Sequence, residues 1–116
     1  MSEVFAFTDK DVESVRRCIQ AIAEGPFLPD WEFATVMGFK RQELQDWLAL
    51  DVFEIEGDAM KMAIAAMNNL SGYPHGKNEE LEDMTNLARN EIRPLLVKFK
   101  KAKGLEPSSS YFDNLV

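Results

Sequence analysis

The stretch Asp30 to Ala49, DWEFATVMGFKRQELQDWLA, decides how the rest of the chain is interpreted. Read as two short helices joined by a tight corner, it places five large apolar side chains on one inward surface: Phe33, Met37, Phe39, Leu44 and Trp47. Ala34 falls where two helices would approach closely, and Gly38 falls where the chain must turn. The spacing therefore predicts helices over 31–37 and 40–50 with a corner between them.

This spacing resembles a helix-turn-helix motif, in which one helix braces a second at a steep angle. The resemblance covers residues 30–49 only, and it implies a DNA-binding regulator if the second helix presents groups that reach bases and phosphates. Five side chains would face outward from that helix on this register: Lys40, Arg41, Gln42, Gln45 and Asp46. Lys and Arg suit phosphate or guanine, and Gln suits adenine.

Helical periodicity extends through the other segments as well. It predicts an all-α fold, a compact single-domain bundle of about five helices over 8–24, 31–37, 40–50, 59–70 and 79–103. Pro94 lacks a backbone N–H and clashes with the carbonyl four residues earlier, so the last helix should be kinked or split there. Residues 1–104 would form the helical domain, and 105–116 a loosely ordered tail.

Capping and composition support the first and fourth helices. Thr8 and Asp11 have capping-box spacing, and Gly25 before a proline suits a left-handed helix end. The segment 59–70 is apolar nearly all round, with three methionines, which is typical of a central buried helix. The same apolar surface leaves a homodimer open as an alternative to burial within one chain.

The charge of the chain, −7 in total, is unevenly distributed. Residues 40–60 sum to −4, whereas residues 89–104 sum to +5. Negative charge repels the phosphate backbone of DNA and favours encounter with a basic protein, although it also serves solubility alone. Basic residues of the last helix would rescue DNA binding only if they lay beside the corner.

The leading hypothesis is therefore a non-enzymatic helical protein that binds a basic protein partner, of the inhibitor, immunity or antitoxin type. Its acidic face would comprise Glu43, Asp46, Asp51, Glu54, Glu56 and Asp58. Trp31, on a proline-bounded link, would be an aromatic anchor of that face or else part of the core. A helix-turn-helix DNA-binding regulator, with contacts from Lys40, Arg41, Gln42 and Gln45, is the alternative.

Catalysis is the weakest of the three readings. The chain has one histidine, His75, in the glycine-rich loop 71–78, and it is the one candidate general base. Zinc sites take three or four His, Cys or acidic ligands, so one His and the single Cys18 predict no metal and no cofactor. Four carboxylates at the start of the last helix lack the spacing of a calcium loop.

Location is also constrained by the sequence. No apolar run reaches the length that spans a bilayer, and acidic residues stand near the N-terminus where an export signal carries positive charge. One cysteine excludes an intrachain disulfide, and Cys18 is expected to be a small buried hydrophobe. We therefore expect a cytoplasmic protein without a membrane partner.

Overall fold

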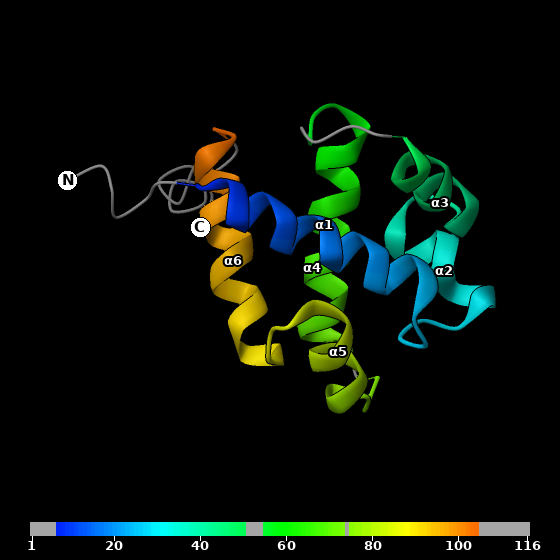
Figure 1. Cartoon of the computed structure of the whole chain (residues 1–116). Helices are drawn as coiled ribbons and strands as arrows, with labels where there is room; N and C mark the ends of the chain where they lie inside the picture. The colour runs from blue at the N-terminus through cyan, green and yellow to red at the C-terminus, as the bar shows by residue number, and fades with distance from the viewer. Residues whose placement is uncertain (1–6, 51–54, 74, 105–116) are drawn as a thin grey trace, which may run out of the picture.

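The computed structural model of the chain describes residues 7–50, 55–73 and 75–104, and these contain six α-helices and no strand (Figure 1). The helices are α1 (Asp9–Glu24), α2 (Asp30–Met37), α3 (Arg41–Ala49), α4 (Asp58–Gly72), α5 (Asn78–Thr85) and α6 (Arg89–Ala102). The all-α prediction is confirmed, with one helix more than expected. The predicted tail over 105–116 lies outside the described residues.

Helix α4 is the central helix of the bundle. It packs against α1, α2 and α6, and Figure 1 shows α2 and α3 on one side of it and α6 on the other. Its inward side chains include Met62, Met67 and Leu70, all buried, as its apolar composition predicts. Burial of such side chains from water supplies most of the free energy that holds the helices together.

The start of α1 forms as its sequence predicts. The Asp11 amide donates to Thr8 Oγ1 over 3.2 Å, and the Thr8 amide donates to Asp11 Oδ2 over 2.9 Å, which completes a capping box. The same Asp11 carboxylate lies 2.9 Å from Lys98 Nζ on α6. One carboxylate therefore caps α1 and also ties α1 to α6.

The end of α1 depends on close packing at Gly25. The expectation of a left-handed cap there is wrong, because Gly25 has φ −93°, which any residue can adopt. A Cβ at this position would lie 2.5 Å from Phe27 Cε2, 2.6 Å from the Ala21 carbonyl oxygen and 2.9 Å from Met84 Sδ. Gly25 is therefore required by the lack of space rather than by its backbone angle.

The predicted helix over 79–103 is divided, but not at Pro94. The break lies between α5 and α6, where Asn86 adopts a left-handed conformation with φ 66°. Thr85 Oγ1 donates to the Leu81 carbonyl and accepts from the Leu87 amide, so its hydroxyl satisfies backbone groups on both sides of the turn. Helix α6 continues through Pro94, so the chain is not split at that residue, and the kink expected there stays a prediction.

Helices α1 and α3 each donate a hydrogen bond from an arginine to a carbonyl at the C-terminal end of the other. Neither has a basic residue in its own last turn. Arg41 at the start of α3 donates from Nη1 to the Ala23 carbonyl at the end of α1 over 2.9 Å. Arg16 of α1 donates to the Leu48 carbonyl at the end of α3 over 3.1 Å. Each helix thus supplies the cation that stabilises the C-terminal carbonyls and the negative dipole end of the other.

Candidate functional site

The predicted helix-turn-helix segment folds as two helices with a left-handed corner. Gly38 has φ 80°, and its amide donates to the Ala34 carbonyl over 2.9 Å. The five side chains predicted to face inward are buried or half-buried: Phe33, Met37 and Leu44 are in the core, and Phe39 and Trp47 pack against it. Ala34 is exposed, so the prediction that it marks a close approach of two helices is wrong.

Arg41 points into the protein, which corrects the prediction that it faces DNA. Besides the Ala23 carbonyl, its guanidinium reaches the carbonyls of Ile22 and Leu28 and the carboxylate of Asp30. It also lies 4.4 Å from the centroid of the Phe33 ring. Backbone carbonyls therefore occupy the guanidinium of Arg41, the one arginine of α3.

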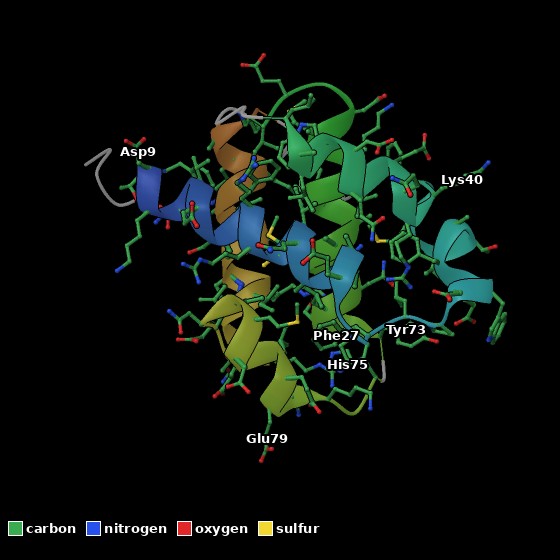
Figure 2. The ribbon with its side chains drawn as sticks, turned by 45° about the vertical axis from the view of Figure 1, so that its right-hand side comes forward. Asp9, Phe27, Lys40, Tyr73, His75 and Glu79 are labelled. Atoms are coloured by element: carbon green, nitrogen blue, oxygen red, sulfur yellow. The ribbon has the colours of Figure 1, made fainter. Side chains whose placement is uncertain are left out.

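The remaining outward side chains of α3 are mixed in charge. Lys40 and Gln42 are exposed, with Lys40 directed to solvent in Figure 2, and Gln45 is half-buried. Glu43 is exposed and accepts from the Lys40 amide over 2.7 Å, and exposed Asp46 accepts from Gln42 Nε2 over 2.8 Å. The basic helix α6 lies across α4 from this segment (Figure 1), so its lysines do not add positive charge to the corner.

Trp31 is the most exposed large apolar side chain among the described residues. It lies in the first turn of α2 with 80 % of its surface accessible to solvent. Exposure of an indole to water is unfavourable because its surface is mostly apolar. Protein interfaces are accordingly enriched in Trp at their hot spots. The prediction of Trp31 in the core is therefore excluded, and that of a surface anchor remains.

A carboxylate precedes Trp31 and another follows it. Asp30 Oδ1 accepts from Arg41 Nη2 over 2.8 Å, and Glu32 Oε1 accepts a short hydrogen bond from the Tyr73 hydroxyl. The bond to Glu32 raises the pKa of Tyr73, because the hydroxyl proton stabilises the carboxylate. Both carboxylates are thus oriented by side chains from outside α2.

We define the α2–α3 surface as a set of seven exposed residues from these two helices and their corner. They are Asp30, Trp31, Ala34, Lys40, Gln42, Glu43 and Asp46. An open hollow of about 370 Å³ lies between the helices, lined in part by Ala34, Lys40 and Gln45. The surface carries three carboxylates, one amine and the exposed indole of Trp31.

The structure divides the predicted acidic face between two elements. Glu43 and Asp46 belong to the α2–α3 surface, whereas Glu56 and Asp58 are exposed at the start of α4. That end of α4 is at the top of the bundle in Figure 1, where α6 ends. Asp51 and Glu54 lie outside the described residues. Glu43 and Asp46 are therefore the members of the predicted face that lie on α3, the helix that packs against the helix of Trp31.

His75 contacts the backbone of the protein through both of its ring nitrogens. Its Nδ1 accepts from the Lys77 amide over 2.9 Å, and its Nε2 lies 3.1 Å from the Leu70 carbonyl at the end of α4. A nitrogen that accepts from an amide leaves the other as the donor, so both nitrogens are engaged. The ring meets that of Phe27 edge-on, with 5.0 Å between the ring centroids. Figure 2 shows the two side chains next to each other. This geometry leaves no lone pair for the general-base role considered from the sequence.

Cys18 and the acidic residues are the other groups whose chemistry could support a reaction or a metal site. Burial raises the pKa of the Cys18 thiol to about 12, which keeps it protonated and unreactive. Among the residues that the structure describes, no three His, Cys, Asp or Glu side chains are grouped so that they could hold a metal ion. The four carboxylates of α5 are exposed, and Glu79 points away from the bundle in Figure 2.

Comparisons with known proteins leave the α2–α3 surface to be interpreted from its own chemistry. No protein-family model, curated protein or solved structure matches the chain. Within the described ranges, no helix has both the length and the hydrophobicity needed to cross a bilayer.

Proposed function

We propose that this chain is a non-enzymatic protein that binds a basic protein partner through the α2–α3 surface. The observation that carries the proposal is Trp31, which is 80 % exposed and belongs to a surface on which carboxylates outnumber cations. A large exposed aromatic side chain with polar neighbours is a typical component of an interface hot spot. Complementary charge would speed the encounter with a basic partner.

The class of partner follows from size and charge. A compact acidic domain can cover a basic active site or a nucleic-acid-binding surface, which is how inhibitors, immunity proteins and antitoxins act. The total charge of −7 suits such a partner. The proposal places the protein in the cytoplasm, where its single thiol stays reduced.

The test begins with capture of a partner by the immobilised chain from an extract of the source organism. The captured protein is identified, purified and titrated against the chain by calorimetry at about 50 and 300 mM salt. The proposal expects a basic protein whose affinity falls as salt rises. Trp31→Ala should weaken the purified complex by about 2 kcal/mol, and Asp46→Lys should weaken it as well.

Two control variants match these changes elsewhere on the surface. Val97→Ala truncates an exposed apolar side chain on α6, and Asp83→Lys makes the same charge change on α5. Both should bind as the unaltered chain does. Equal loss in Asp46→Lys and Asp83→Lys would show that total charge, and not this surface, determines binding.

The DNA-binding alternative has one observation in its favour, the exposed Lys40 and Gln42 at the start of α3 behind a glycine corner. It predicts a gel shift with duplex DNA of random sequence at about 50 mM salt that disappears as salt rises. A gel shift of this kind that is lost in Lys40→Glu would show that the chain binds DNA and would contradict a basic protein as the partner of this surface.

A further inference from the structure

We infer that Trp31 is the docking point for an arginine side chain of the partner, stacked on the indole and bonded to a carboxylate beside it. The inference rests on the proposed function and names the chemical group that the α2–α3 surface takes. Asp30 and Glu32 flank Trp31 in the chain, and successive residues of a helix project about 100° apart. The two carboxyl side chains therefore leave the helix about 100° to either side of the indole, one directed to Arg41 and the other to Tyr73.

Among the residues that the structure describes, a guanidinium lies over an aromatic ring in two places. Arg41 lies 4.4 Å from the Phe33 ring centroid, and Arg16 lies 4.9 Å from that of Trp47. Trp has the strongest cation–π interaction of the aromatic side chains. Trp31 is the exposed one of the two tryptophans, and within the described residues no cation lies over its ring.

The flanking carboxylates are held in place by contacts within the protein, yet each has an oxygen to spare. Asp30 uses Oδ1 for Arg41, and Glu32 uses Oε1 for Tyr73. In the described part of the chain, neither Asp30 Oδ2 nor Glu32 Oε2 has a hydrogen-bond donor. An acceptor whose orientation is already fixed loses less entropy on binding, which favours an external donor at these oxygens.

The chemistry favours arginine over lysine. A guanidinium is planar, so it can stack on the indole while its N–H groups point sideways to a carboxylate. An ammonium group is a more strongly hydrated point charge and cannot do both as well. The N-terminus of α2 carries about half a positive charge, which opposes any cation, so the carboxylates are required to outweigh it.

The experiment uses the full chain and two synthetic probes, an oligoarginine peptide and an oligolysine peptide of the same length. Binding is followed by the indole N–H peaks of Trp31 and Trp47 in the NMR spectrum, assigned with Trp31→Phe. Oligoarginine should shift the Trp31 peak to saturation and bind at least about threefold more tightly than oligolysine. The Trp47 peak should move little.

Matched double variants locate the effect. Asp30→Asn with Glu32→Gln keeps both internal acceptors but removes two charges, and should weaken oligoarginine binding about fivefold or more. Glu79→Gln with Glu80→Gln removes two charges from α5, and should weaken it less than about twofold. Equal weakening in the two double variants, equal affinity for the two peptides, or an unmoved Trp31 peak would overturn the inference.

These outcomes are separable from the fate of the proposed function. A basic protein that binds with the expected salt and Asp46 dependence, while oligoarginine leaves the Trp31 peak unmoved, overturns the arginine site alone. A Trp31 peak that responds to oligoarginine as described supports the arginine site even if no basic protein is captured.

Discussion

The guanidinium of Arg41 lies 4.4 Å from the ring centroid of Phe33, with the Phe33 side chain buried and Arg41 three-quarters buried. The ring comes from α2 and the cation from α3, so this pair closes the corner between the two helices. The same guanidinium satisfies carbonyl groups at the end of α1 and in the following connector. Arg41 therefore joins three segments at one point.

Replacement of Arg41 by Ala should lower the free energy of unfolding by about 2–3 kcal/mol, because several part-buried carbonyls lose their donor. Arg41→Lys should retain only part of this stability, since an ammonium cannot reach the same carbonyls in a planar fork. Urea unfolding measures both. Lys40→Ala, at the neighbouring exposed position, should change stability by less than about 0.5 kcal/mol; a comparable loss there would contradict the assignment.

Replacement of Asp11 by Asn should reduce stability at neutral pH by about 0.5–1 kcal/mol, after allowance for solvent screening. Partial burial alone would raise the pKa of Asp11, but the Thr8 amide and Lys98 lower it further than burial raises it. A carboxyl whose pKa is lowered by folding stabilises the protein above its unfolded pKa, and this contribution disappears as pH falls through the folded pKa. Unfolding at pH 7 and at about pH 2.5 should show a difference between the two proteins at the higher pH only.

Local signals explain the parts of the fold that the sequence predicts well. The capping box at Thr8, the left-handed Gly38 and the apolar α4 each depend on residues close together in the chain. The sequence points to Pro94 rather than Asn86 as the break in the last helix, because proline is the stronger helix-breaking residue and stands only eight positions further on. Within α6 the helix accommodates Pro94, while the Thr85 hydroxyl stabilises a turn earlier.

The candidate site was predictable only in part. Trp31 and the acidic residues could be named from the sequence, but the inward direction of Arg41 depends on carbonyls that lie 13 to 19 residues earlier. One signal was present: neither α1 nor α3 has a basic residue in its last turn, so each needs a cation from elsewhere. The link between Tyr73 and Glu32 spans 41 residues and has no local signal.

Replacement of His75 by Ala should destabilise the protein by about 1–3 kcal/mol, because the Lys77 amide and the Leu70 carbonyl lose their partner and Phe27 loses a ring contact. His75→Asn should lose less, since an Asn side chain can accept from an amide two residues later. Thermal or urea unfolding distinguishes the two. Equal stabilities of the Ala and Asn variants would show that the Lys77 contact is not important.

Gly25 at the end of α1 and Gly38 at the corner between α2 and α3 should differ in the stability that each loses on replacement by Ala. At Gly38 nothing lies within 4 Å of an added Cβ, and the loss of about 1 kcal/mol would come from positive φ alone. At Gly25 an added Cβ would meet the Ala21 carbonyl and the Phe27 ring, so a loss of about 3 kcal/mol is expected. A larger loss at Gly38 than at Gly25 would contradict the packing seen here.

Because α1 and α3 each place an arginine at the C-terminal carbonyls of the other, residues 30–49 cannot be moved to another protein without losing these contacts. Residues 30–49 carry Arg41, but the carbonyls of Ile22 and Ala23 that receive it belong to α1, as does the Arg16 that closes α3. A graft of residues 30–49 onto a foreign scaffold would remove the three carbonyl acceptors of Arg41, would keep only its contact with Asp30, and would leave the end of α3 without Arg16. The smallest portable unit is therefore the segment from α1 to α3.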